Sequence, residues 1–310
     1  MRTLWTMRVS VIIPAYNEES VLPLLLSDLA KQSERDLEVI VADAGSSDRT
    51  REVAAETGAV VVDGGLPGVG RNRGAAIARG ETLVFLDSDV RIPSDFLRAA
   101  LDEMDRRRVD VATAEARPLS DLALDRLIHR MANLFIRLNQ EIEPHAPGYC
   151  ILVRNEVFRK TGGFNEDVLV AEDHDFVSRA ADHGTFRMLL DPWFQVSVRR
   201  YEKEGRIAYS LKAARITLYR LLNGEITDPE IVEYEFGDFT AEDKNTAQKV
   251  LRKIESGIID VDRNIQEMER NLEDAIARGT RKLEGFQEPL DWARKALKDV
   301  GDALFGDDDD

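Results

Sequence analysis

Between about residue 8 and residue 200, short apolar runs alternate with polar segments. Four runs are rich in β-branched residues and end at turn-forming residues, so they are predicted to be buried strands: residues 9–13, 37–42, 59–62 and 82–86. Helical composition marks the segments between them: residues 19–31, 48–57 and 70–79. Ser46, Ser47 and Asp48 supply capping oxygens at the start of the second helix. This succession predicts an α/β fold with a mostly parallel central sheet flanked by helices.

The last part of the chain has a different pattern. From residue 242 to residue 305, apolar residues recur at alternating spacings of three and four, with a break near Gly279. This spacing predicts a helical hairpin that either forms a homo-oligomer as a coiled coil or packs on the main domain. We therefore expect one α/β domain over residues 1–236 and a helical extension over residues 237–310. An amphipathic helix at residues 207–222 is expected to pack in the core, contact a second copy or lie on a membrane surface.

The composition excludes several classes of protein. The 310 residues are 43% hydrophobic, which is enough to bury a core, and no apolar run approaches the ~18 residues of a transmembrane helix. The N-terminus lacks the features of a secretory signal, and the single Cys150 cannot form an intramolecular disulfide. A cytoplasmic protein is expected, with peripheral attachment at the inner membrane face as an alternative. The formal net charge of −16 opposes binding to nucleic acid.

Polar residues that could take part in binding or catalysis follow three of the predicted strands. Residues 14–19 follow the first, residues 43–48 follow the second, and Asp87-Ser88-Asp89 follows the fourth. Because ligand sites in parallel sheets lie beyond the carboxyl ends of the strands, we expect these segments to converge. Asp87 and Asp89 lie on the same side of an extended chain, and paired carboxylates suit Mg²⁺ or Mn²⁺ when a diphosphate supplies further ligands.

Together these segments resemble the family 2 glycosyltransferases, which have the GT-A fold. The resemblance covers about residues 8–205 and is carried by six segments in matching order: residues 14–19, 43–50, 70–74, 87–89, 148–150 and 172–173. It implies a GT-A fold and transfer of a sugar from a nucleoside diphosphate sugar, linked to UDP or GDP, to a hydroxyl acceptor. A lipid-linked acceptor is one alternative.

The resemblance implies roles for the residues that would contact the nucleoside. Pro14, Ala15 and Tyr16 would form the wall beside the nucleobase. Glu18 would lie near the ribose or the base. Asp43 would accept a hydrogen bond from an N–H group of the base ring.

It also implies a cation site. Asp87 would lie near the ribose and a metal-bound water, and Asp89 would bind the Mg²⁺ or Mn²⁺ directly, with Ser88 between them. The cation would neutralise charge on the leaving diphosphate. Arg71 is assigned to the nucleotide or, as an equal alternative, to the start of a helix.

On the acceptor side, Gly148 and Tyr149 match the family's acceptor-proximal strand, and the Glu172-Asp173 pair matches its catalytic motif. The resemblance makes Asp173 the base that takes the proton of the acceptor hydroxyl. We expect repulsion among Glu172, Asp173 and Asp175 to raise their pKa values.

The chain departs from the processive members of the family. It lacks their Gln-x-x-Arg-Trp motif, so a non-processive enzyme is expected, and the third metal ligand that many members carry in this region has no obvious match. Arg199 and Arg200 form a basic cluster there, which is predicted to fold over the diphosphate as a lid or, alternatively, to form a solvated turn.

These features predict a metal-dependent transferase that inverts the anomeric carbon. Two alternatives stay open. One is a retaining GT-A transferase that makes a small glycosylated metabolite. The other is a nucleotide-sugar-binding or scaffold protein whose site is catalytically silent.

Overall fold

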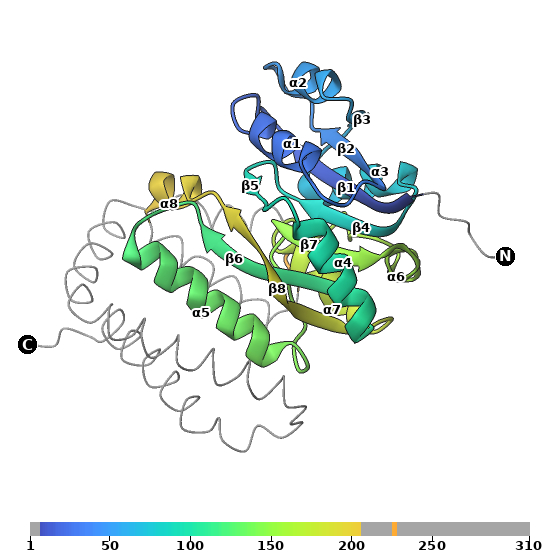
Figure 1. Ribbon diagram of the computed structural model, residues 1–310, viewed down its shortest axis with the longest axis vertical. Coiled ribbons are helices and arrows are strands. Elements are labelled where there is room, and N and C mark those ends of the chain that lie inside the picture. The colour runs from blue at the N-terminus through green and yellow to red at the C-terminus, as the bar shows by residue number, and fades with distance from the viewer. Residues whose placement is uncertain (1–6, 206–224, 228–310) are drawn as a thin grey trace, which may run out of the picture.

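The computed structural model describes residues 7–205 and 225–227 (Figure 1). Its strands form one mixed sheet in the order β3-β2-β1-β4-β7-β6-β8-β5. The strands are β1 Met7–Ala15, β2 Leu37–Asp43, β3 Val60–Asp63, β4 Gly80–Leu86, β5 Val90–Arg91, β6 Val111–Pro118, β7 Cys150–Arg154 and β8 Phe186–Val196. The helices are α1 Leu22–Ala30, α2 Thr50–Glu56, α3 Pro67–Ile77, α4 Phe96–Arg107, α5 Ala123–Asn139, α6 Asn155–Thr161, α7 Glu172–Ala181 and α8 Arg199–Glu204.

The four strands predicted from the sequence form one parallel half of the sheet. β1 pairs with both β2 and β4, and β2 pairs with β3, all in parallel. The helices expected between them are confirmed as α1, α2 and α3. The N-cap residue of α2 is Arg49, whose side chain makes no capping hydrogen bond, so the cap expected from residues 46–48 is wrong; Asp48, one residue earlier, accepts a hydrogen bond from the Thr50 backbone N–H at 2.9 Å. α3 begins at Pro67, earlier than predicted, because proline suits the first turn of a helix.

The other half of the sheet reverses direction. β7 runs antiparallel to both β4 and β6, whereas β6 and β8 are parallel. Cys150, the first residue of β7, is paired with Leu86, the last residue of β4. The chain therefore enters β7 at the carboxyl end of β4. This topology places Gly148 and Tyr149 at the same edge of the sheet as residues 14–19, 43–48 and 87–89. We call these three segments, together with the Gly148 segment, the reactive segments.

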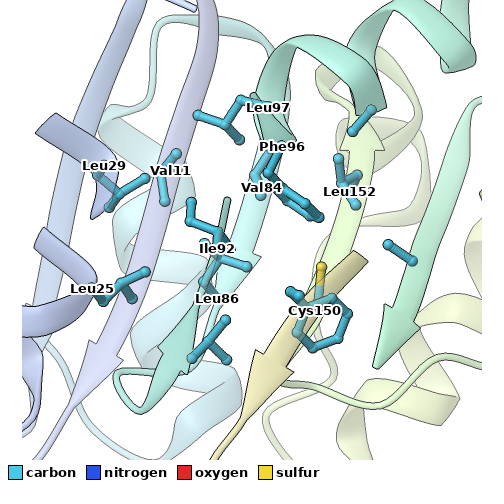
Figure 2. Close-up of a cluster of buried hydrophobic side chains, with 14 of the residues drawn as sticks. Val11, Leu25, Leu29, Val84, Leu86, Ile92, Phe96, Leu97, Cys150 and Leu152 are labelled. Atoms are coloured by element: carbon cyan, nitrogen blue, oxygen red, sulfur yellow. The ribbon is translucent and has the colours of Figure 1, made fainter. Parts of the chain in front are cut away.

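Alternate residues of the central strands pack on opposite faces of the sheet. On one face, Val11, Val84 and Leu86 contact a cluster that includes residues of α1 and α4, and this cluster is drawn in Figure 2. On the other face, Ile12 and Phe85 belong to a second cluster that includes residues of α3, α6 and α7. Burial on both faces explains why the central strands are continuous apolar runs. The core thus fixes the strand ends that carry the reactive side chains.

The second cluster contains a group of aromatic rings below the edge where the reactive segments meet. Phe164 and Phe176 are stacked with ring centroids 4.3 Å apart, and Phe85 meets Phe164 edge to face at 5.1 Å. Such pairs add stability beyond their buried area. The rings pack β4, α7 and the loop after α6 against one another.

Two predicted elements lie outside the described residues: the amphipathic helix at 207–222 and the helical hairpin at 237–310. Within residues 225–227, Ile226 forms an isolated antiparallel bridge with Val170. Across the described ranges, none of the helices combines the length and the apolar character that a membrane crossing requires.

Candidate functional site

The reactive segments meet at the carboxyl edge of the parallel strands. Ala15, at the end of β1, is paired with Asp43, at the end of β2. Asp87 follows β4 directly, and its backbone N–H donates to the Tyr149 carbonyl at 3.3 Å. The convergence expected from the sequence is therefore present. The residues that precede β7 lie beside these strand ends.

Asp43 is 2% exposed and holds the loop that follows β2. Its Oδ2 accepts hydrogen bonds from the backbone N–H groups of Gly45 and Ser46 at 3.2 and 3.3 Å and pairs with Arg51 at 3.3 Å. Its Oδ1 is buried and has no hydrogen-bond partner among the described residues. Because buried acceptors are normally satisfied, an unpaired oxygen marks a position where a ligand N–H could bind after a small rearrangement.

The segment after β1 is tied to the segment after β2. The Glu18 backbone N–H donates to Thr50 Oγ1 at 2.7 Å, and the Asn17 amide oxygen accepts from the Ser47 backbone N–H at 2.8 Å. Asn17 has a left-handed backbone conformation, with φ of 53°. Beside this turn the ring of Tyr16 is 60% exposed, whereas Ala15 is buried. Tyr16 is therefore placed as an open aromatic surface at the edge of the site.

Arg71 is the central contact of the site and is only 3% exposed. Its Nη1 donates to Glu172 at 2.7 Å, and its Nη2 donates to Asp87 at 3.0 Å and to the Gly148 carbonyl at 3.1 Å. The guanidinium carbon also lies 5.3 Å from the centre of the Phe164 ring. Arg71 lies inside α3, and one buried cation links the end of β4 to the start of α7.

Gly148 occupies a position where a side chain would not fit. A Cβ there would lie 2.6 Å from Arg71 Nη2 and 3.1 Å from Asp173 Oδ2. The Gly148 backbone N–H donates to Asp173 Oδ2, while its carbonyl accepts from Arg71. Glycine is needed here because two functional side chains approach the backbone closely.

The Glu172-Asp173 pair begins α7 and is partly buried. Burial raises the pKa of Asp173, and the charge of Asp87 adds to this, while Arg71 and two backbone N–H groups oppose it. Burial also raises the pKa of Glu172, with repulsion from Asp173 as the next cause. The expected direction is correct for both groups, but loss of solvent is the main cause and repulsion is secondary.

Asp175 does not share this environment. It pairs with Arg179 at 2.5 Å, and Arg179 also donates to the Thr161 and Gly163 carbonyls. Asp175 therefore anchors α7 to the loop after α6. The residue preceding the pair, Ala171, has φ of 61°, a strained conformation for a residue with a Cβ that sequence reasoning did not identify.

Two histidines lie beside the acidic pair. The rings of His145 and His174 are 5.1 Å apart, and His145 is also 5.2 Å from the ring of Phe135. His145 was not predicted as a site residue, because a lone histidine in a loop carries no local signal in the sequence. It lies near the acidic pair only through the fold.

Arg199, on α8, connects the segment that follows β1 with the segment that follows β4. Its guanidinium donates to both oxygens of Glu18 at 3.0 and 3.1 Å and to Asp89 Oδ2 at 2.9 Å. Hydrogen bonding to Glu18, then to Asp89, keeps the pKa of Arg199 above its usual value. Arg200 is the next residue of α8 and is exposed. Arg199, the first member of the basic cluster, is thus bound to carboxylates of the site.

The carboxylates available as metal ligands fit a cation that also binds a phosphate of the nucleotide. Within the described ranges, His, Cys, Asp and Glu side chains do not gather in groups of three or more that could hold a metal ion. Asp87 and Asp89 nevertheless offer two carboxylates at one strand end, and Mg²⁺ commonly takes one or two carboxylates and completes its shell with water and phosphate oxygens. Each of the two is paired with an arginine, Asp87 with Arg71 and Asp89 with Arg199.

Comparison with known proteins identifies the family. Residues 10–162 match the family model described as glycosyl transferase family 2. The chain is 40% identical over 105 residues to 4,4'-diaponeurosporenoate glycosyltransferase of Staphylococcus haemolyticus, which covers 31% of this chain and 28% of that protein. It is 25% identical over 244 residues to the poly(ribitol-phosphate) beta-N-acetylglucosaminyltransferase TarS of Staphylococcus aureus, which covers 73% of this chain and 42% of TarS. The matches thus span less than half the length of these relatives.

Solved structures agree on the fold. The mannosyltransferase PcManGT of Pyrobaculum calidifontis, in complex with GDP-Man and Mn²⁺, matches 94% of this chain and 81% of its own with a TM-score of 0.56 at 20% identity. Residues 1–349 of S. aureus TarS, in complex with UDP-GlcNAc, match 86% of this chain and 92% of theirs with a TM-score of 0.53 at 20% identity. The expected GT-A fold is therefore confirmed, and residues 10–162 belong to glycosyl transferase family 2.

Proposed function

We propose that the chain transfers a sugar from a nucleoside diphosphate donor to a hydroxyl acceptor, with inversion of the anomeric carbon and with Mg²⁺ or Mn²⁺. The observation that carries the proposal is the contact set of Arg71. This one buried guanidinium bonds to Asp87 on the donor side, to Glu172 on the acceptor side and to the Gly148 carbonyl between them. Residues assigned separately to the two substrates thus form one connected site.

The donor side is supported by Asp43 and Tyr16. The unpaired, buried Oδ1 of Asp43 suits an N–H group of a nucleobase, and the exposed ring of Tyr16 offers a surface against which a base can stack. Relatives of similar fold have been solved with UDP-GlcNAc and with GDP-Man. We therefore propose a UDP- or GDP-linked sugar as the donor.

For the cation, we propose Asp89 as a direct ligand and Asp87 as its neighbour. The bound cation would supply Lewis-acid stabilisation of the leaving diphosphate. The similarity to PcManGT, solved with Mn²⁺, supports this choice of ion. We propose that Arg199 and Arg200, on the short helix α8, bind phosphate oxygens of the donor with their guanidinium groups.

For the base, we propose Asp173. Its raised pKa favours acceptance of a proton from an acceptor hydroxyl, because a carboxylate of higher pKa is a stronger base. The Gly148 and His174 backbone N–H groups hold its two oxygens in a fixed orientation. A carboxylate held in this way can activate a hydroxyl for direct displacement at the anomeric carbon, and a single displacement inverts the configuration.

A binding screen followed by product analysis tests the proposal. We expect a UDP- or GDP-sugar with Mn²⁺ to raise the melting temperature of the wild-type protein, and Asp89→Ala to abolish the part of the shift that depends on Mn²⁺. Arg106→Ala, which removes an exposed arginine of α4, is the control and should behave as wild type.

The configuration of the transferred sugar, read by NMR, distinguishes the alternatives. Inversion supports Asp173 as the base in a single displacement. Retention would support the retaining transferase instead. Binding without turnover for every donor and acceptor tried would favour a catalytically silent protein.

A further inference from the structure

Arg199 lies where it contacts carboxylates from two different strand ends. A single guanidinium nitrogen, Nη2, is 3.0 Å from Glu18 Oε1 and 2.9 Å from Asp89 Oδ2. The other terminal nitrogen is 3.1 Å from Glu18 Oε2. Glu18 follows β1 and Asp89 follows β4, which are neighbours in the sheet, and Arg199 comes 181 and 110 residues after them in the chain. Only the fold brings the three side chains together.

The pairing is partly shielded from solvent. The side chain of Arg199 is 46% exposed, but those of Glu18 and Asp89 are only 19% and 21% exposed. The helix that carries Arg199 is held in place by contacts of its own, because the ring of Tyr201 lies 5.6 Å from the buried ring of His129 on α5. Since arginine does not lose its proton in proteins, Asp89 has a permanent positive neighbour in this state.

A divalent cation and this guanidinium compete for the same carboxylate. A cation bound to Asp89 must displace Arg199 from Asp89 Oδ2 or bind beside a positive charge, and both weaken its binding. A nucleoside diphosphate changes the competition, because its phosphate oxygens offer the guanidinium paired acceptors in the geometry that suits it. The arginine can then leave Asp89 without losing charged partners.

We propose that Arg199 makes cation binding at Asp89 conditional on the nucleotide. Without nucleotide the guanidinium occupies Asp89, and with nucleotide it moves to the diphosphate and releases Asp89 to the cation. Arg199 is thus a positioning residue that couples the two ligands, and the coupling is reciprocal, because each ligand strengthens the other by the same factor. The inference rests on the proposed function, in which Asp89 binds the cation.

Two binding measurements test the coupling without any turnover. Electron paramagnetic resonance measures the affinity of the free protein for Mn²⁺ alone. Calorimetry measures the affinity for UDP and for GDP without a divalent ion and at saturating Mn²⁺. For Arg199→Ala and Arg199→Gln, we expect Mn²⁺ alone to bind about tenfold more tightly than to wild type, within the range usual for linked sites. The gain in nucleotide affinity on adding Mn²⁺ should shrink by a similar factor.

Arg106→Ala removes an equal charge far from Asp89 and should leave both quantities at wild-type values. If Arg199 acted only through the repulsion between its charge and Mn²⁺, the Arg199 variants would bind Mn²⁺ more tightly with and without nucleotide. The gain in nucleotide affinity on adding Mn²⁺ would then be the same as in wild type. That result, or an unchanged affinity for Mn²⁺ alone, would overturn the inference while leaving the proposed function intact. A wild-type protein that binds no Mn²⁺ even with UDP or GDP would overturn both.

Discussion

At the scale of single residues, the site is organised by arginines that each serve more than one carboxylate. Arg71 pairs with Asp87 and Glu172, and Arg199 pairs with Glu18 and Asp89. The pairs of Arg71 are costly to break, because an unpaired charge in a buried position is strongly unfavourable, whereas Arg199 is half-exposed. The acidic residues of the site are therefore held in place by cations of the chain itself.

The burial of Asp173 leads to a prediction for stability. Its pKa is raised in the folded protein, so folding favours its protonated form. This contribution is fully present below the pKa of the unfolded chain and is lost as pH rises through the raised folded value. We expect the melting temperature of Asp173→Asn relative to wild type to be higher at pH 7–8 than at about pH 3.5, by about 2–4 °C, because only the wild type gains a buried negative charge over this range.

Melting curves of both proteins across this pH range, in the same buffers, provide the measurement. Asp175→Asn is the matched control, because Asp175 pairs with Arg179 and its loss should lower the melting temperature at neutral pH. A relative melting temperature of Asp173→Asn that falls from about pH 3.5 to pH 7–8 would show that the ionised carboxylate stabilises the fold.

At the scale of elements, the close approach of α3 to β1 sets the position of Arg71. A Cβ at Gly74 would lie 2.5 Å from Ile12 Cγ2, whereas a Cβ at Gly70 on the same helix would make only ordinary contacts, the nearest at 3.5 Å. Ile12 is fully buried in the centre of the sheet, so it has little room to move. The helix can lie this close to the strand only because Gly74 has no side chain.

We expect Gly74→Ala to lower the free energy of unfolding by about 1–3 kcal/mol, the usual cost of overpacking. Gly70→Ala should be neutral or stabilising by up to about 1 kcal/mol, because alanine favours the helix more than glycine does. Denaturant unfolding of the two variants measures the difference. Equal stability of the pair would contradict the packing assigned to α3.

The elements also show where sequence reasoning succeeds. Continuous apolar runs predicted β1 to β4, because strands buried on both faces have this pattern. The direction of β7 could not be read in the same way, since a short buried run does not show whether its neighbour is parallel. Likewise, the burial of Arg71 was not predictable, because the atoms that surround it come from β4, β7 and α7.

At the scale of the whole molecule, the net charge of −16 gives a misleading picture of the site. Five of its carboxylates are paired with arginines of the chain: Glu18, Asp43, Asp87, Asp89 and Glu172. The order of the motifs in the sequence was sufficient to predict the fold and the candidate residues. The pairing that partly offsets their charge was not predictable, because Arg199 follows Glu18 and Asp89 at long range, and only the folded sheet brings them together.

In the proposed reaction, Asp173 acts as the base of a sugar transfer at this edge of the sheet. The most direct test compares wild type with Asp173→Asn for two quantities in Mn²⁺: affinity for the nucleotide sugar found by the binding screen, and the rate of nucleoside diphosphate release with acceptor. We predict affinity within about threefold of wild type and a rate lower by about 10²–10⁴-fold. A variant that binds the donor and turns over at the wild-type rate would contradict the assignment.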